Sequence, residues 1–91
     1  MILEEEREKY VVNKPIDQVT IDEPMGEVMI NEPVRRLIVN AEVDLLEVNA
    51  AIRELVVMEG ASISLIVANE TVGRIIGEEL VKEFIDNAVP V

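Results

Sequence analysis

A nine-residue rhythm of apolar and polar positions runs through the first half of the chain. Each unit contains two apolar residues separated by one other residue, then Asn or Asp, any residue, often proline, a third apolar residue and two further residues. The Asn/Asp position recurs every nine residues at Asn13, Asp22, Asn31, Asn40 and Asn49. Nine residues make two and a half turns of α-helix, which would place successive copies on opposite helix faces. The period therefore favours a short strand followed by a turn.

Residues 10–43 are expected to be extended. Apolar residues alternate with other residues across 19–21, 28–30 and 37–43, as they do in half-buried strands. Residues 23–26 read Glu-Pro-Met-Gly, with proline at the second turn position and glycine at the fourth. A type I turn favours that arrangement, so we expect a β-hairpin here.

The second half of the chain begins with helical signals. Asp44 can cap a helix, and Glu47 supplies the partner carboxylate of a capping box. Apolar residues then recur at helical spacing up to Gly60, where a helix commonly ends. The sequence therefore predicts a helix over residues 44–59.

This predicted helix is apolar around much of its circumference. Leu46, Ala50 and Val57 lie on a face different from that of the main apolar stripe. Such a helix is either sandwiched between layers or meets another molecule, so these three residues are candidate interaction residues.

The C-terminal third predicts one strand and one helix. Residues 62–68 form a short, nearly continuous apolar run, typical of a central strand that is covered on both faces. Helical spacing follows and predicts a helix over residues 78–87, stopped by Pro90. Gly73 and Gly77 weaken any extension of this helix towards Thr71, because glycine costs about 1 kcal/mol relative to alanine inside a helix.

Two architectures accommodate these elements. The favoured one is a two-layer α/β (α+β) fold, in which a β-meander is followed by a β-α-β-α arrangement with a right-handed crossover. The alternative is a short β-solenoid of nine-residue arcs, two per coil, with Asn and Asp stacked at the corners and a helix at the C-terminus. Five recognisable copies supply only about two and a half coils, and the helical signal after Asp44 conflicts with the last copy.

Length and composition indicate one small domain, residues 10–91, preceded by an acidic arm or short helix at residues 1–9. The chain has 91 residues, of which 49% are hydrophobic, but only Tyr10 and Phe84 are aromatic. The core is therefore expected to be aliphatic. No apolar run approaches the roughly 18 residues of a membrane span, and the acidic N-terminus does not resemble a secretory signal. We expect a soluble protein, cytoplasmic or part of a particle.

The residue types that most often carry catalysis are scarce. The chain has no His and no Cys, so the commonest general base and the strongest nucleophile are absent. Ser62 and Ser64 stand without an adjacent base, and no pair of carboxylates is distinguished from the others. We therefore expect a non-enzymatic protein with no catalytic residues and no cofactor.

Oxygen-bearing side chains near the turns raise the question of a metal. Asp22-Glu23 and Asn31-Glu32, with Asn13 and Asn40, could line one edge with the ligands that Ca²⁺ or Mg²⁺ prefer. The same residues are common at turns because they favour turn geometry. No EF-hand loop is present, so no metal site is assigned, and Ca²⁺ remains an open alternative.

The net charge of −11 argues against direct nucleic-acid binding, which needs clustered Lys and Arg. The apolar surplus instead favours a structural or assembly subunit that forms homo-oligomers, of the capsid-decorating, filament or scaffold type. The alternatives are a cation-binding protein and an acidic module or inhibitor that engages a basic partner. The residues expected to face such a partner include Asp22, Glu23 and Glu32, with Glu4–Glu6, Asp17 and Glu27.

Overall fold

The structure, a computed structural model, describes residues 8–87, which form nine strands and one short 3-10 helix. The strands are β1 (Glu8–Val12), β2 (Ile16–Ile21), β3 (Met25–Ile30), β4 (Val34–Val39), β5 (Glu42–Val48), β6 (Ile52–Val57), β7 (Ser62–Ala68), β8 (Val72–Ile76) and β9 (Phe84–Asp86). The 3-10 helix η1 (Glu78–Leu80) lies between β8 and β9.

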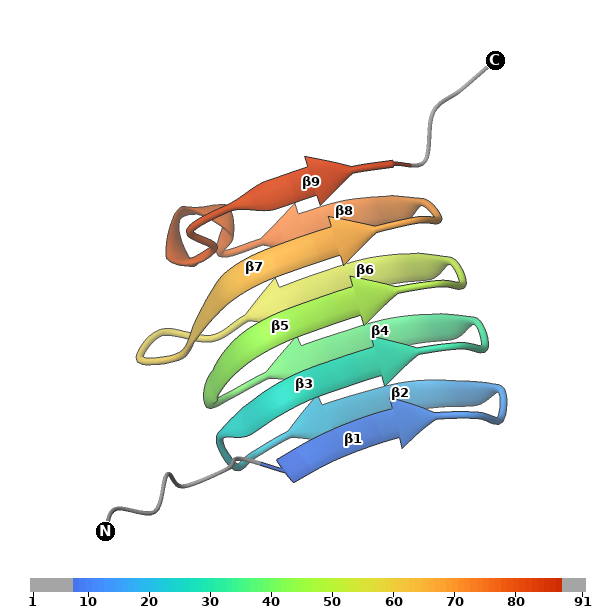
Figure 1. The fold of residues 1–91 in the computed structure, drawn as a ribbon, viewed down its shortest axis with the longest axis horizontal. Helices are drawn as coiled ribbons and strands as arrows, with labels where there is room; N and C mark the ends of the chain where they lie inside the picture. The colour runs from blue at the N-terminus through green and yellow to red at the C-terminus, as the bar shows by residue number, and fades with distance from the viewer. Residues whose placement is uncertain (1–7, 88–91) are drawn as a thin grey trace, which may run out of the picture.

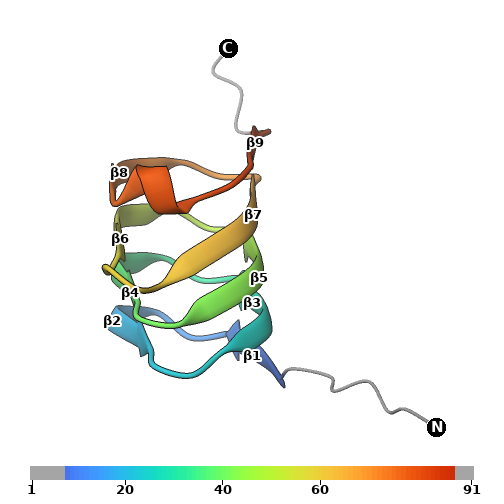
Figure 2. The same cartoon turned by 90° about the vertical axis from the view of Figure 1, so that its left-hand side faces the viewer.

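The strands wind into a parallel β-solenoid. The odd-numbered strands form a five-stranded sheet in the order β1-β3-β5-β7-β9, here sheet A, and the even-numbered strands form sheet B in the order β2-β4-β6-β8. Every strand pairs in parallel with the strand two further along the chain (Figure 1). Two strands and two corners therefore make one coil, and the two sheets lie on opposite sides of the stack (Figure 2).

One coil spans 18 residues except at a single corner. Val12 pairs with Ile30, and Ile30 with Val48, but Val48 pairs with Ala68. The two additional residues lie in the corner between β6 and β7, where the N–H of Ala61 donates to the carbonyl of Met58 at 2.9 Å. This turn absorbs the insertion, so the coils above it continue in register.

Each nine-residue unit directs its apolar residues into the space between the sheets. In β4, for example, Val34, Leu37 and Val39 are buried, whereas Arg35 and Arg36 are exposed. Successive coils place like residues above one another in continuous aliphatic rows. No polar or charged side chain of residues 8–87 is buried, so the core is held by aliphatic packing.

The favoured α/β architecture is wrong, because residues 8–87 contain no α-helix. The segment 44–59, expected to be helical, lies in β5, a corner, β6 and the start of the next corner. Its buried residues follow the unit's inward positions, whose steps include four residues (Val48 to Ile52) and three residues (Ile52 to Leu55). These steps equal those of one helix face, so the solenoid pattern resembles a helical pattern over this length.

Two further local predictions are wrong. The turn before Met25 does not close a hairpin, because β2 and β3 belong to different sheets. The expected helix 78–87 is reduced to η1, after which the chain extends into β9 and pairs with β7. Pro90, expected to stop that helix, lies outside the described residues.

The alternative architecture is confirmed, with two arcs per coil and extended segments across residues 10–43. The described residues contain nine strands rather than five arcs. The strand predicted at 62–68 is confirmed as β7, paired on both sides. The predicted arm at residues 1–9 lies largely outside the described residues; its last two, Glu8 and Lys9, begin β1.

Candidate functional site

One corner of the solenoid carries a continuous ladder of five asparagine side chains, Asn13, Asn31, Asn49, Asn69 and Asn87. Each amide nitrogen Nδ2 donates to the Oδ1 of the asparagine one coil earlier, at 3.2, 3.0, 2.8 and 3.0 Å along the chain. The ladder is therefore polar. Its first member, Asn13, ends it with amide N–H donors, and its last member, Asn87, ends it with a carbonyl acceptor.

The oxygen-bearing residues considered for a metal do not share one edge. Asn13 and Asn31 belong to the ladder and bond to each other. Asp22 and Asn40 lie at the opposite corner, after β2 and β4. Within residues 8–87, no three acidic side chains converge closely enough to hold a metal ion.

The six predicted interaction residues are dispersed. Leu46 and Val57 lie in the core, 1% and 3% exposed, so they have no free surface for a partner. Ala50 is half-buried at the asparagine corner. Since no helix forms here, the face that these three were expected to share is absent.

The acidic members of that set occupy both corners. Asp22 and Glu23 are exposed between β2 and β3, whereas Glu32 is half-buried at the asparagine corner between β3 and β4. Glu4–Glu6 lie outside the described residues. The structure therefore does not gather these carboxylates on one face.

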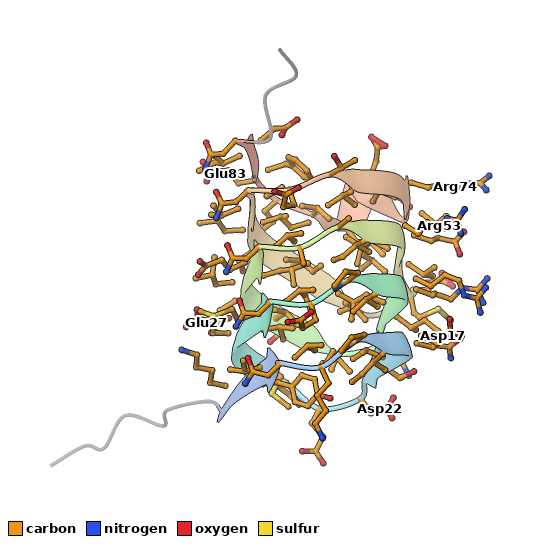
Figure 3. All side chains as sticks on the ribbon, turned by 90° about the vertical axis from the view of Figure 1, so that its right-hand side faces the viewer. Asp17, Asp22, Glu27, Arg53, Arg74 and Glu83 are labelled. Carbon is orange, nitrogen blue, oxygen red and sulfur yellow. The ribbon has the colours of Figure 1, made fainter. Side chains whose placement is uncertain are left out.

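Charge is instead divided between the two sheets. The strands of sheet B contain two carboxylates, Asp17 and Glu54, and four arginines, Arg35, Arg36, Arg53 and Arg74. The strands of sheet A contain six carboxylates and one lysine. Figure 3 shows Arg53 and Arg74 on one side of the coils and Glu27 and Glu83 on the opposite side. We call the outer face of sheet B with its four arginines the arginine face.

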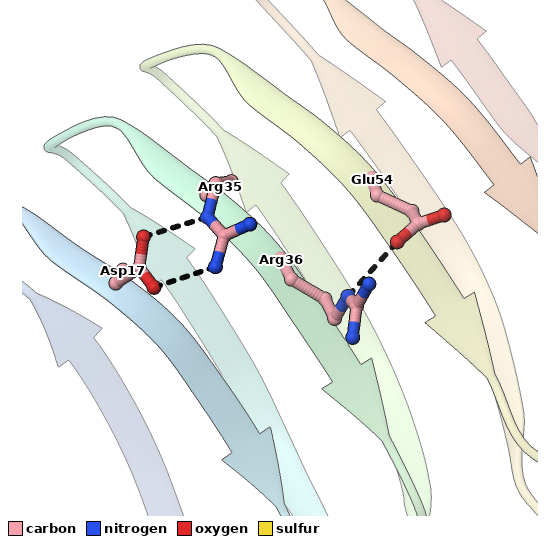
Figure 4. A network of polar contacts seen from close by, with 4 residues as sticks. All are labelled: Asp17, Arg35, Arg36 and Glu54. Carbon is pink, nitrogen blue, oxygen red and sulfur yellow. Dashed lines mark hydrogen bonds and ion pairs between the residues drawn. The ribbon is translucent and has the colours of Figure 1, made fainter.

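Two of these arginines are paired with carboxylates (Figure 4). Arg35 donates from Nε and Nη2 to the two carboxylate oxygens of Asp17 at 2.7 and 2.8 Å, and Arg36 donates from Nε to Glu54 at 2.9 Å. The hydrogen bonds from Arg35, with its positive charge, hold the pKa of Asp17 below its ordinary value of 3.8. The same pairing raises the pKa of Arg35.

A groove runs beside the arginine face. It has a volume of about 560 Å³ and lies where the asparagine corner meets sheet B, between Pro15 and Pro33 on one side and Arg35 and Arg53 on the other. Gly73 continues the row of Arg35 and Arg53, and a Cβ there would lie 2.7 Å from the carbonyl oxygen of Arg53. The groove therefore narrows onto bare backbone at its upper end.

A second hollow of about 270 Å³ is lined by the four arginines and Glu54. Arg53 and Arg74 form no ion pair within the part of the chain that the structure describes. The sequence analysis did not single out this cluster. Its signal is the recurrence of Arg35 and Arg53 at the coil period of 18 residues, which becomes visible only once two arcs are assigned to each coil.

The two ends of the solenoid present strand edges. Within residues 8–87, β1 pairs only with β3, and β9 only with β7. Large apolar side chains are exposed here, namely Tyr10 (37%), Ile76 (44%), Phe84 (39%) and Ile85 (40%). Tyr10 and Phe84, the chain's two aromatic residues, occupy opposite ends of one row of stacked residues.

We found no match between this chain and any protein family model, curated protein or solved structure. Residues 8–87 include no helix with the length and apolar character needed to cross a bilayer. Function is therefore inferred from the geometry of the corners, the arginine face and the two ends.

Proposed function

We propose that this protein is a non-enzymatic structural subunit that forms homo-oligomers through the ends of its solenoid. The observation that carries the proposal is the unpaired edges of β1 and β9 with their exposed apolar residues, Tyr10, Phe84 and Ile85. An unpaired strand edge is a template for pairing with another chain, and natural proteins usually protect it with charge, proline or a covering segment. Burial of these residues by a second copy would stabilise both copies.

The side-chain chemistry agrees with a structural role. The chain has no His and no Cys, and of its two serines, Ser64 is exposed and Ser62 is half-buried. The described charged residues lie in surface rows, where Asp17 and Glu54 pair with arginines of the next strand. This arrangement favours a scaffold over a catalytic centre.

The test measures native mass against protein concentration, by light scattering and sedimentation velocity. We expect mass to rise with concentration in the wild type, and the variant Ile85→Glu to remain a monomer. The matched control is Val67→Glu, because Val67 lies in the same outward row one strand earlier, and Glu47 already occupies that row. The control should assemble like the wild type. A wild type that stays monomeric up to about 1 mM, where the association energy is only about 4 kcal/mol, would refute the proposal.

A second candidate function is the binding of an acidic peptide to the arginine face. Its support is specific: Arg53 and Arg74 lack ion-pair partners in the described chain, and both line the 270 Å³ hollow. A basic partner has less support, because Asp22, Glu23 and Glu32 are divided between two corners.

A poly-glutamate peptide is a suitable probe for this second function. Its binding should weaken as salt is added and should be lost in the double variant Arg53→Gln/Arg74→Gln. Lys14→Gln, at an exposed corner position away from the arginine face, is the charge-matched control for one substitution and should bind normally. Absence of binding at low salt would eliminate this candidate.

A further inference from the structure

The end strands β1 and β9 of sheet A carry matching residues at equivalent positions of the nine-residue unit. Strand pairing defines rows that run the length of the sheet, such as Tyr10, Val28, Leu46, Ile66 and Phe84. The two ends of each row can therefore be compared directly. The terminal pairs are Lys9 with Glu83, Tyr10 with Phe84, Val11 with Ile85, Val12 with Asp86, and Asn13 with Asn87.

We propose that copies of this chain join head to tail, with β1 of one copy pairing in parallel with β9 of the next. The register is the one that already stacks β1 on β3. This inference rests on the proposed assembly function and specifies its joint and its polarity. The product is a polar filament in which sheet A continues from copy to copy.

Charge and shape complement each other across this joint. Lys9 would lie beside Glu83, repeating the contact that Lys9 Nζ makes with Glu27 Oε1 at 3.8 Å within one molecule. Tyr10 would stack on Phe84, and each now leaves more than a third of its surface exposed. Aromatic pairs add to the stabilisation that burial of their surface provides, so the two aromatic residues of the chain would complete each other's row.

The asparagine ladder favours one relative orientation. Its donor end, Asn13, meets its acceptor end, Asn87, only in a head-to-tail joint. A joint between two N-terminal ends would oppose two donor ends and bring Lys9 towards a second Lys9. A joint between two C-terminal ends would oppose two acceptor ends and bring Glu83 towards a second Glu83.

The joint belongs to sheet A alone. Since β9 follows β8 by half a coil, β2 of an incoming copy cannot pair with β8 while its β1 pairs with β9 (Figure 1). Val12 and Asp86 are the one pair that is not complementary. We therefore expect a reversible joint whose occupancy depends strongly on concentration.

The test introduces cysteines into the outward row of sheet A, in the double variant Val11→Cys/Ile85→Cys. The chain has no native Cys, so every disulfide reports an introduced contact. Adjacent strands lie about 4.8 Å apart, within the Cα separation of about 4.4–6.8 Å that a disulfide spans. Within one molecule the two positions are four strand spacings apart, about 19 Å, so they cannot bridge internally.

Oxidation of the double variant should produce dimers, trimers and higher multimers on a non-reducing gel, and reductant should return them to monomer. The single variants Val11→Cys and Ile85→Cys should stay monomeric. The matched control pairs Val11→Cys with Val67→Cys, which lies inside the same row and has no position at the joint. It should give no ladder of multimers.

A charge exchange tests the same joint without cysteine. Lys9→Glu and Glu83→Lys each oppose like charges and should raise the dissociation constant roughly two- to fivefold, as expected for one exposed ion pair. An equimolar mixture of the two variants restores opposite charges at every joint and should recover the wild-type constant.

The outcomes separate the inference from the function on which it rests. Efficient dimers of either single-cysteine variant would show that like ends meet and would overturn the head-to-tail joint. Oligomers in solution without cross-links in the double variant would also overturn it, while leaving the assembly function intact. A wild type that is monomeric at every concentration would refute both.

Discussion

Removal of the central member of the asparagine ladder should destabilise the protein more than removal of a terminal member. Asn49 donates to Oδ1 of Asn31 at 3.0 Å and accepts from Nδ2 of Asn69 at 2.8 Å. The substitution Asn49→Ala therefore deletes two ladder bonds. Asn13→Ala deletes only the single bond that Asn31 donates at 3.2 Å.

The expected magnitudes follow from these counts. One intramolecular hydrogen bond contributes about 0.5–1.5 kcal/mol, so Asn49→Ala should lower the free energy of unfolding by about 2 kcal/mol and Asn13→Ala by about 1 kcal/mol. In a domain of this size, 1 kcal/mol corresponds to about 4–8 °C in Tm. We expect Tm to fall by about 8–16 °C for Asn49→Ala and by about 4–8 °C for Asn13→Ala.

Urea and thermal unfolding followed by far-UV circular dichroism would measure both variants. Asn40→Ala is the matched control, because Asn40 occupies the same position of the unit at the opposite corner, outside the ladder. It reports the loss of asparagine's turn preference alone and should cost less than Asn49→Ala. Equal losses for Asn49→Ala and Asn13→Ala, or for Asn49→Ala and Asn40→Ala, would refute cooperative stabilisation by the ladder.

Three further substitutions test the core, a corner and the arginine face. Leu37→Ala, at a fully buried position, should cost about 2–5 kcal/mol in urea unfolding, and a loss below about 1 kcal/mol would contradict a close-packed core. Gly77→Ala should lower Tm further than Gly60→Ala. Both glycines have positive φ, +87° and +91°, but only at Gly77 would a Cβ overlap a backbone carbonyl oxygen; equal shifts would argue against that overlap. Asp17→Asn should reduce stability at neutral pH and match the wild type in acid. The carboxylate's lowered pKa means that its ion pair with Arg35 stabilises the fold above about pH 4, and this contribution is lost as pH falls through the folded pKa; a difference that persists in strong acid would contradict this.

The nine-residue pattern correctly predicts which residues of the first half are extended, but not how the strands pair. Val19 and Ile21 look the same in a hairpin strand and in a solenoid arc, because both expose alternate residues. The difference lies in the pairing of Val19 with Leu37, 18 residues away, which no local signal encodes. A turn signal such as Pro24 is equally compatible with a hairpin and with a corner.

The second half was misread because two patterns coincide there. Inward positions of an arc follow steps of three and four residues, as helix faces do, and Asp44 and Gly60 add the signals of helix ends. Asp44 instead points outward from β5, and Gly60 uses its positive φ of +91° in a corner. Gly60 was therefore correctly recognised as a chain reversal, but assigned to the wrong element.

The matching ends of sheet A could not be recognised from sequence, because the insertion between Val57 and Ser62 breaks the period. Tyr10 and Phe84 fall in one row only after these two residues are assigned to a corner. The arginine face has the same dependence, since Arg53 and Arg74 lie on either side of the insertion.

The 18-residue coil has a consequence for how such a chain can change its length. Deletion of residues 25–42 would join Pro24 to Val43 and preserve every inward position, because Val43 takes the place of Met25 in its row. Duplication of the same segment would add one layer by the same logic. A gene for this protein can therefore grow or shrink by whole storeys, each new floor resting on the one below and none of them serving as the foundation.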